Sequence, residues 1–459
     1  MYRFYVDDHA NKYHYDELCR VFLPDNEFEI ICIDKLPKQS LLGENSFVLG
    51  DFENADRDAI KRELYEKLSS LTEMKPEWGT LTGVRPLKPA LAVLDKSESL
   101  DEMSEVLRQK YLLSDSKIGL LSDIAKYQRM YVKGNPSDMI SIYAGIPFCP
   151  TRCEYCSFAS NVADDKAIEE YLANLCKETE YCGKLYKTHP KKIESVYIGG
   201  GTPTTLSASQ LKDLISRISD SFKINPADIE FTVEAGRPDT ITEEKLKTIK
   251  NCGVSRISIN PQSMKDETMR LIGRDHSAQD IRNAFAAARR VGFEVINADL
   301  IAGLPKETPE DFANSLDEII RLGAENITVH TLSVKRGSRL HENDPEYYRR
   351  DIDRVSKMLS YAGSRLKGSD YHPYYIYRQK HQMGAFENVG YCLEGKHSIY
   401  NIRIMEDKQS IIALGAGGVG KIYYPEEDRI ERVANVSNYE IYNERFNEML
   451  ERKDKYFGG

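Results

Sequence analysis

The sequence has no long apolar run and no excess of positive charge. None of its apolar stretches approaches the roughly 20 residues that a membrane-spanning helix needs. The opening residues lack the positively charged start and the apolar stretch of a secretion signal. The formal net charge is -9, which leaves no electrostatic footprint for nucleic acid or an anionic membrane. We therefore expect a cytoplasmic protein without a membrane span and without a nucleic-acid partner.

Cysteine is present nine times, but its distribution excludes a disulfide framework. The number is odd, and six of the nine are scattered singly or in unremarkable pairs. In the cytoplasm these thiols would stay reduced. The other three, Cys149, Cys153 and Cys156, lie close together in one short segment. They are the first candidates for chemistry.

The length of 459 residues is enough for two or three domains. Residues 1–75 combine short apolar segments with a charged helical run, which indicates a small α+β module. Residues 76–138 read as a helical linker region with leucines at helical spacing. Residues 139–345 alternate between strand-like and helix-like segments, and residues 346–459 are irregular and rich in tyrosine. We expect this last part to be a C-terminal α+β domain that covers the substrate.

The alternating region predicts an α/β fold. Six β-rich runs are expected at residues 140–146, 193–198, 229–235, 255–260, 294–300 and 326–332. Five amphipathic helices are expected between them, near residues 166–187, 207–222, 242–252, 277–292 and 309–323. This order implies right-handed βαβ units and a parallel sheet. Six units are too few for a closed eight-stranded barrel, so we predict an open, partial (β/α)6 barrel with ligands at the carboxyl ends of its strands.

The three clustered cysteines follow the first predicted barrel strand. Cys149, Cys153 and Cys156 have C-x3-C-x2-C spacing. Three thiolates can hold three corners of a [4Fe-4S] cluster, whereas a fully ligated cluster needs four. The open iron can chelate the amino and carboxyl groups of S-adenosylmethionine (SAM), and electron transfer can then release a 5′-deoxyadenosyl radical. The alternatives are a zinc site, which usually needs a second ligand pair, and three inert buried cysteines.

Polar or glycine motifs follow the later strands as well. Gly199-Gly-Gly-Thr-Pro-Thr204 would let the backbone come close to a ligand, although a tight turn would need one of these glycines. Glu234 and Asp299, at strand ends, can accept hydrogen bonds from ribose hydroxyls or the SAM ammonium. Taken alone, each is more often a satisfied structural residue. The same choice stays open for Asn260, Gln262 and Arg274.

A second glycine-rich segment resembles a phosphate-binding loop only in part. Gly415 to Lys421 fits G-x4-G-K, but Ile422 stands where magnesium binding requires Ser or Thr. A close backbone approach to the barrel mouth is the better interpretation. Several cations could bind an anionic substrate or could be solvated surface charge. They are Lys335, Arg336, Arg339, Arg378, Lys380 and His381.

The motifs together resemble the oxygen-independent coproporphyrinogen III oxidases (coproporphyrinogen dehydrogenases) of the radical SAM superfamily. The resemblance is strong over residues 140–340 and weaker beyond. It rests on Ile146-Pro-Phe-Cys149 with Cys153 and Cys156, Gly199 to Thr204, Arg256-Ile-Ser-Ile, Gln262-Ser, Gly273-Arg-Asp-His276 and Asp299-Leu-Ile-Ala-Gly-Leu-Pro305. Asn260-Pro-Gln-Ser263 and the tyrosine-rich stretch from Tyr374 to Lys380 look most like the HemZ-type branch.

The resemblance implies roles for individual residues. Tyr143, Gly200 and Glu234 would contact the SAM molecule on the cluster. An adjoining site that can hold a second SAM would be lined by Tyr155, Gly201, Thr202, Gln262, Arg274, Asp299 and Thr331. The implied reaction converts two propionates of a tetrapyrrole substrate to vinyl groups, with a donor such as flavodoxin or ferredoxin supplying electrons.

Two departures from the family pattern keep other functions open. Gly145 stands where the family has a histidine, and the haem-binding pattern of its chaperone relatives is only echoed at His397-Ser-Ile-Tyr-Asn. The only tryptophan is Trp78. The alternatives are another radical SAM reaction on a tetrapyrrole, such as methyl transfer or ring opening of haem, and a haem chaperone.

Overall fold

A computed structural model describes residues 1–34, 43–51, 56–156, 161–188 and 190–456. The chain forms two compact units. The first contains residues 1–126 and 376–387, and the second contains residues 127–375 and 388–459. No described helix is long and apolar enough to cross a membrane. The predicted division at residues 75, 138 and 345 stays a prediction.

The first unit contains a small parallel sheet with the strand order β2-β1-β3. The strands are β1 (Tyr2–Val6), β2 (Phe28–Cys32) and β3 (Ser46–Val48). The helices are α1 (Lys12–Phe22), α2 (Arg57–Thr72), α3 (Leu87–Ser97), α4 (Leu100–Tyr111) and α5 (Asp115–Tyr131), the last of which continues into the second unit. Apolar residues of β1, α1 and α2, including Phe4, Leu18 and Leu64, form one buried core. This core gives the first unit a fold of its own.

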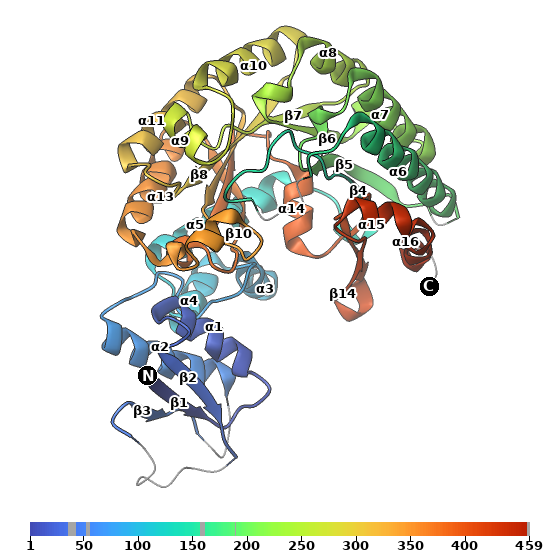
Figure 1. Cartoon of the computed structure of the whole chain (residues 1–459). Coiled ribbons are helices and arrows are strands. Elements are labelled where there is room, and N and C mark those ends of the chain that lie inside the picture. Colours follow the sequence, from blue (N-terminus) through green and yellow to red (C-terminus); the bar gives the residue numbers. More distant parts are fainter. Residues whose placement is uncertain (35–42, 52–55, 157–160, 189, 457–459) are drawn as a thin grey trace. The chain divides into compact units, whose positions relative to one another are not determined.

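The second unit is built on the six parallel strands that the sequence predicts. They are β4 (Met139–Ile146), β5 (Lys192–Gly200), β6 (Glu230–Gly236), β7 (Arg256–Ile259), β8 (Val295–Ala302) and β9 (Asn326–Thr331). The helices after them are α6 (Asp165–Tyr186), α7 (Ala208–Phe222), α8 (Glu243–Asn251), α9 (Asp266–Leu271), α10 (Ala278–Val291) and α11 (Pro309–Arg321). The long helices lie along the outer side of the curved sheet (Figure 1). The predicted partial barrel is therefore confirmed.

The remaining elements follow β9 in the sequence, and their strands extend this sheet at both edges. They are α12 (Arg339–Asn343), α13 (Ile352–Lys367), β10 (His372–Tyr377), β11 (Asn388–Cys392), α14 (Ile399–Glu406), β12 (Ser410–Leu414), β13 (Val419–Tyr424), β14 (Arg429–Ala434), α15 (Tyr439–Glu444) and α16 (Phe446–Lys453). The full strand order is β10-β11-β9-β8-β7-β6-β5-β4-β12-β13-β14. β11 runs antiparallel to β9, and β12 runs parallel to β4. Residues after 346 thus complete the sheet that carries the barrel.

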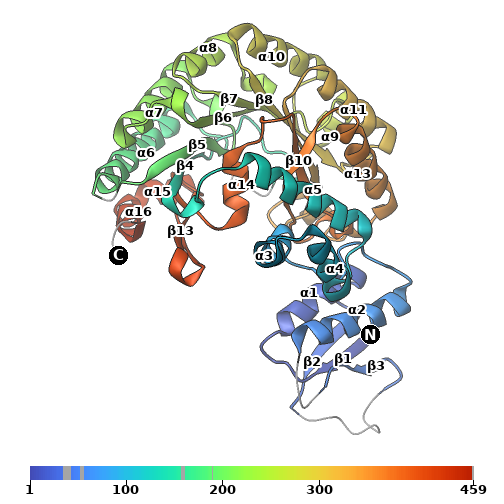
Figure 2. The ribbon, with the colours of Figure 1, turned by 180° about the vertical axis from the view of Figure 1, so that it is seen from behind.

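Helix α14 lies on the inner side of the curved sheet, opposite the long helices (Figure 2). The carboxylate of Glu230, at the start of β6, accepts hydrogen bonds from the backbone amides of Ile399 and Tyr400 at 2.8 and 3.0 Å. Anionic groups at a helix N-terminus are stabilising. Buried Arg403 forms a bidentate pair with Glu194 of β5, at 2.7 and 2.8 Å. These contacts fix one helix inside the open barrel.

Capping side chains start the outer helices directly after the strand-end loops. Ser207 forms a capping box with Gln210 at the start of α7, and Thr308 forms one with Asp311 at the start of α11. Reciprocal bonds of this kind satisfy backbone donors that the first helical turn leaves free. The short loops between strand ends and helices are therefore well defined, and they carry the candidate site.

Candidate active site

The cysteine loop follows β4 at the carboxyl end of the barrel sheet. The amide of Cys149 donates to the carbonyl of Asn161 at 3.0 Å, and the amide of Cys156 donates to the carbonyl of Cys153 at 3.2 Å. The amide of Glu154 donates to the carbonyl of Ile272 at 3.0 Å. Backbone bonds thus tie the loop to the segment that follows α9. All three thiols are free of disulfides.

The glycine loop after β5 packs directly on the cysteine loop. The amides of Gly201 and Thr202 donate to the carbonyls of Ile146 and Phe148, both at 2.7 Å, and the Thr202 hydroxyl donates to Cys149 Sγ at 3.4 Å. A Cβ atom on Gly201 would lie 2.9 Å from this sulfur and 2.6 Å from the Phe148 carbonyl oxygen. The glycines therefore allow two loops to meet, which is more than a tight turn requires.

The three thiols form a mutually interacting group. Burial raises the pKa of Cys149 to about 11, and the nearby Cys156 and Cys153 add to the increase, while the bond from Thr202 opposes it. In the part of the chain that the structure describes, no three His, Cys, Asp or Glu side chains converge on a single metal ion. Three thiols at one strand end are a donor set that fits a cluster with one open iron.

Glu234, near the end of β6, is the central acid of the strand ends. It accepts a hydrogen bond from Asn260 Nδ2 at 3.2 Å, and the backbone amide of Gly200 also bonds to it. A Cβ atom on Gly199 would lie 2.7 Å from Glu234 Oε2. Burial, reinforced by the negative charge of Asp299, raises the pKa of Glu234 to about 8. The residue can therefore hold a proton near neutral pH until a cation or a hydrogen-bond donor binds beside it.

Asp299 of β8 has the opposite electrostatic character. Burial alone would raise its pKa, but the nearby His330, a hydrogen bond from Asn297 and the neighbouring Thr328 bring the pKa below its usual value. Asn297 Nδ2 donates to Asp299 Oδ1 at 2.9 Å, and His330 Nε2 lies 3.7 Å from Asp299 Oδ2. The pKa of Glu234 is thus raised and that of Asp299 lowered, although the two acids lie on nearby strands. Neighbouring acids whose pKa values are shifted in opposite directions are typical of functional sites.

Arg274 and Gln262 connect the cysteine loop to these acids. Buried Arg274 donates to the carbonyl of Asn260 at 2.6 Å and lies beside Tyr155 and Cys153. Gln262 has a left-handed backbone, with φ of +68°, and its amide donates to the carbonyl of Asp299 at 2.9 Å. The backbone of Gln262 is therefore held against β8.

Several buried polar atoms in this region have no hydrogen-bond partner. They are Asn260 Oδ1, Gln262 Oε1, Asn297 Oδ1 and Arg274 Nε. Buried polar groups in native proteins are normally paired, so unpaired ones mark a place where a ligand or water binds. A polar molecule rich in donors, such as a nucleoside with an amino-acid group, fits this set. The residues present therefore fit a ligand such as SAM, and the roles of the individual residues stay predictions.

Three tyrosines line the inner side of the sheet below these acids. The rings of Tyr143 and Tyr197 lie 6.3 Å apart, and the ring of Tyr400 from α14 stacks on Tyr197 at 4.7 Å. Thr331, also predicted to line the site, is buried at the end of β9, and its amide donates to Asn388 Oδ1 of β11 at 2.8 Å. Thr331 is thus bonded to a neighbouring strand, while the other predicted residues interact with one another.

Tyr197, Asn297, His330 and Tyr400 contact the predicted site residues or one another, and the sequence reasoning did not name them. The signal for two of them was strand alternation: Tyr197 precedes Gly199 by two residues, and Asn297 precedes Asp299 by two, so each pair shares a face of the sheet. His330 had no such signal, because Thr328, two residues before it, was not among the predicted site residues. Tyr400 had no local signal, because only the tertiary fold brings α14 into the barrel.

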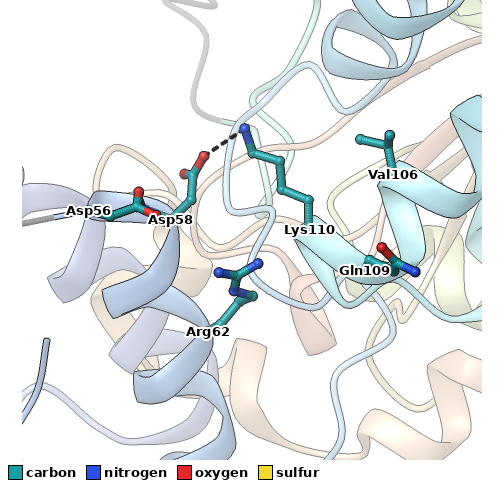
Figure 3. A pocket seen from close by; sticks show the side chains of 6 residues that line it. All are labelled: Asp56, Asp58, Arg62, Val106, Gln109 and Lys110. Atoms are coloured by element: carbon teal, nitrogen blue, oxygen red, sulfur yellow. Dashed lines mark hydrogen bonds and ion pairs between the residues drawn. The ribbon is translucent and has the colours of Figure 1, made fainter.

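A separate pocket lies in the first unit, between α2 and α4 (Figure 3). Its volume is about 380 Å³, and it is lined by Asp56, Asp58, Arg62, Val106, Gln109 and Lys110. Lys110 Nζ lies 2.9 Å from Asp58 Oδ2, so part of its charge is neutralised internally. None of the residues predicted as site residues lines this pocket.

Comparison with known proteins agrees with the geometry at the cysteine loop. A sequence model of the Radical SAM superfamily matches residues 143–319. HemZ of Bacillus subtilis (strain 168), described as an oxygen-independent coproporphyrinogen-III oxidase-like protein, is 41% identical over 393 residues, which are 85% of this chain and 78% of HemZ. The chain belongs to the HemZ family of radical SAM proteins. Membership of this superfamily implies a [4Fe-4S] cluster and SAM as cofactors.

More distant relatives of the HemZ family bear two different functional names. The haem chaperone HemW of B. subtilis is 33% identical over 293 residues, covering 62% of this chain and 71% of HemW. The solved structure of coproporphyrinogen III oxidase (HemN) from Escherichia coli has a TM-score of 0.54 and 22% identity, covering 71% of this chain and 73% of HemN. The structural likeness supports the fold. The choice between an enzyme and a chaperone depends on chemistry.

Proposed function

We propose that the chain is a radical SAM enzyme that oxidatively decarboxylates two propionate groups of coproporphyrinogen III to vinyl groups, giving protoporphyrinogen IX. The observation that carries the proposal is the packing of the three-cysteine loop on the glycine loop, with Glu234 beside both Gly199 and Gly200. The 41% identity to HemZ supports the choice of substrate.

In this proposal each part of the site has a separate task. Cys149, Cys153 and Cys156 hold the cluster, and Tyr143, Gly200 and Glu234 bind SAM. When bound, cluster and SAM supply a 5′-deoxyadenosyl radical, which removes hydrogen atoms from carbon. Glu234 gives up its proton as it accepts hydrogen bonds from SAM. The tyrosine rings on the inner side of the sheet exclude water from beneath the ligand.

The adjoining polar residues would form the second SAM site. They are Tyr155, Gly201, Thr202, Gln262, Arg274, Asp299 and Thr331. The unpaired side-chain oxygen of Gln262 and the unpaired Nε of Arg274 support this assignment. The backbone amide of Thr331 already donates to Asn388. Thr331 would therefore contact the second SAM only through its side chain, at the end of β9. A donor such as flavodoxin or ferredoxin would provide the electron that reduces the cluster.

The proposed substrate reaction is a decarboxylation driven by loss of hydrogen. The β-carbon of a propionate loses one hydrogen atom to the deoxyadenosyl radical, after which the carboxylate leaves as carbon dioxide and one electron passes to an external one-electron acceptor. A vinyl group remains, and the sequence is repeated on a second propionate.

The test is anaerobic reconstitution of the full chain with iron and sulfide, followed by incubation with SAM, a reductant and coproporphyrinogen III. Mass spectrometry should show loss of two carboxyl groups from the tetrapyrrole together with 5′-deoxyadenosine. A variant with all three cysteines replaced by alanine should form neither product. Release of 5′-deoxyadenosine with an unchanged tetrapyrrole would reject the substrate while keeping the reaction class.

A haem chaperone is the second candidate, because HemW is also a relative. His397, in the segment that echoes the chaperone pattern, has Nδ1 3.3 Å from the hydroxyl of Tyr127, and burial lowers the pKa of its imidazole. Binding of one haem per chain, without SAM consumption in the presence of coproporphyrinogen, would favour this function. Loss of that haem in His397→Ala would locate the site.

A further inference from the structure

Arg237 is a buried arginine that joins β6 to the cysteine loop. It follows the last residue of β6, and its side chain is 3% exposed. Its guanidinium Nη1 donates to both the hydroxyl and the carbonyl oxygen of Thr151, at 2.6 and 3.3 Å. Thr151 lies between Cys149 and Cys153. The arginine therefore bonds to the turn that separates two of the proposed cluster ligands.

Asp239 fixes the other side of the same guanidinium. Arg237 Nε donates to Asp239 Oδ1 at 3.0 Å, and Nη2 donates to Asp239 Oδ2 at 2.9 Å. Only Pro238 separates the two residues, and its ring restricts the backbone between them. A bidentate arginine–carboxylate pair has a defined plane and direction. The remaining nitrogen is thereby aimed at the loop.

The backbone around Arg237 supports this direction. Gly236 has a left-handed conformation, with φ of +64°, so the chain turns sharply where β6 ends. The amide of Arg237 donates to the carbonyl of Ala235 at 2.8 Å, and its carbonyl accepts from the Thr240 hydroxyl at 2.8 Å. Strand β6 thus places Glu234 at the proposed SAM site and, at its end, places Arg237 against the cysteine loop.

Thr151 also bonds to a third segment, which follows β7 and α9. Its hydroxyl donates to the carbonyl of Gly273 at 3.1 Å, next to Arg274. His276, also buried, has Nδ1 3.7 Å from Asp239 Oδ1. The arginine, the aspartate, the threonine and the histidine therefore link loops after β6, β4 and β7. The guanidinium of Arg237 is thus bonded to a residue that is two positions from both Cys149 and Cys153.

We propose that Arg237, held by Asp239, is a positioning residue that fixes the turn between Cys149 and Cys153 and keeps a positive charge beside the cluster. The inference rests on the proposed function, because it requires a cluster on these cysteines. Outer partners of metal ligands set ligand orientation and tune redox potential. A fixed cation beside an iron–sulfur cluster makes the cluster easier to reduce.

The test compares Arg237→Gln, Arg237→Lys and Asp239→Asn after identical anaerobic reconstitution. Iron per chain, resistance to a chelator, the electron paramagnetic resonance spectrum and the midpoint potential are measured. Loss of such a partner lowers metal affinity about 10- to 100-fold, so Arg237→Gln should lose its cluster at a chelator concentration about tenfold lower. Its potential should also become more negative, because a positive charge is gone.

The other two variants separate charge from geometry. Asp239→Asn removes a negative charge and keeps the arginine, so its potential should shift in the positive direction while chelator resistance still falls. Arg237→Lys keeps the positive charge, so its potential should stay close to that of wild type. It should lose chelator resistance, because an ammonium group cannot form the bidentate pair with Asp239 and bond to Thr151 at the same time. Potentials and chelator resistance equal to wild type in all three would overturn the inference.

Arg289 provides a matched control at the opposite end of the strands. It donates to the carbonyl of Phe293 at 2.8 Å and to Glu325 at 2.6 Å, so it also joins a backbone carbonyl and a carboxylate. Arg289→Gln should lower the melting temperature but leave potential and chelator resistance unchanged. If the wild-type chain itself forms no cluster, the proposed function fails. That result differs from variants that form a cluster with the same potential and chelator resistance as wild type, which would overturn only the role of Arg237.

Discussion

At the scale of single residues, Glu234 links protonation to ligand binding. Its pKa of about 8 means that the acid is mostly protonated at neutral pH when no ligand is present. A protonated carboxyl cannot accept as many hydrogen bonds from SAM as a carboxylate can. Ligand binding should therefore release a proton from Glu234.

The first prediction concerns the pH dependence of SAM binding. Affinity should increase as pH rises toward about 8, by up to about tenfold per pH unit, and then level off. Anaerobic calorimetry of the reconstituted chain in buffers of different ionisation enthalpy would measure both affinity and proton release. Glu234→Gln should bind SAM about tenfold or more weakly, because a charge-assisted hydrogen bond is lost, and should release no proton. A pH-independent affinity in wild type would contradict the prediction.

The second prediction concerns the stability of the chain without ligands. The folded-state pKa of Glu234, about 8, lies above its ordinary value of 4.5, so the folded state binds more protons between these pH values. Stability from this group is therefore present at low pH and is lost as pH rises through 8. Buried Glu307, whose pKa burial raises to about 7, acts in the same direction.

Thermal melting across this pH range measures the effect. Glu234→Gln should melt at a higher temperature than wild type near pH 8 and should show a shallower decline with pH. Glu307→Gln should remove a further part of the decline. Parallel curves for wild type and Glu234→Gln would show that the acid is not protonated in the folded chain.

The third prediction concerns Gly201. A Cβ atom there would collide with the Phe148 carbonyl and crowd Cys149 Sγ. Gly201→Ala should therefore separate the two loops and reduce iron per chain after reconstitution. Gly363→Ala is the control, because its Cβ would meet only Tyr391 Oη at 3.8 Å. Equal iron content in both variants would refute the importance of this close approach.

At the scale of elements, strand β12 and the turn after it limit the size of the side chain that position 145 can hold. β12 pairs in parallel with β4, and the turn after it brings the Ala416 carbonyl oxygen to 3.0 Å from where a Cβ atom of residue 145 would lie. Tyr171 of α6 donates to the Gly145 carbonyl at 2.6 Å and accepts from the Ala416 amide at 2.9 Å. The turn from Gly415 thus approaches the barrel backbone, as the sequence suggested, and occupies space beside β4.

The fourth prediction follows from this packing. Gly145→His should destabilise the fold by about 1–3 kcal/mol, as overpacking of a closely packed site usually does. Gly145→Ala should cost less, because only one atom is added. Denaturant titration of the chain without ligands would measure both. A stable Gly145→His variant would mean that the turn moves easily.

The alternation of strands and helices made the barrel predictable, because each strand is buried on both faces and each outer helix on one. The motifs after β4 and β5 were also predictable, since cysteine spacing and three glycines restrict local geometry. Arg237, His330 and Tyr400 were not. Their roles depend on which residues of distant strands meet at one end of the sheet. The return of β12 to the edge of β4 is likewise set by long-range pairing.

At the scale of the whole molecule, the first unit is assembled from two separate stretches of the chain. Residues 376–387 complete it, and Glu387 is the acid at its centre. Glu387 Oε1 lies 2.6 Å from Lys117 Nζ, and Glu387 Oε2 accepts from Trp78 Nε1 at 2.7 Å. A buried charge left without its partner is strongly destabilising.

The fifth prediction uses the only tryptophan as a reporter. Glu387→Gln should destabilise the first unit by up to about 3 kcal/mol, since Lys117 would keep only its weaker pair with Glu77 at 3.2 Å. The fluorescence midpoint of Trp78 in denaturant should fall, while iron per chain after reconstitution stays at the wild-type level. Glu105→Gln, in an exposed pair with Arg108, should change neither quantity. An unchanged midpoint in Glu387→Gln would argue against the buried pair.

The discontinuous make-up of the first unit has a consequence for biosynthesis. The stretch that contains Glu387 leaves the ribosome about 250 residues after Lys126. At the usual rate of translation this delay is on the order of tens of seconds. Throughout that interval Trp78 has no acidic partner and Lys117 has only Glu77. The first unit therefore completes its fold only after residues 376–387 have been synthesised.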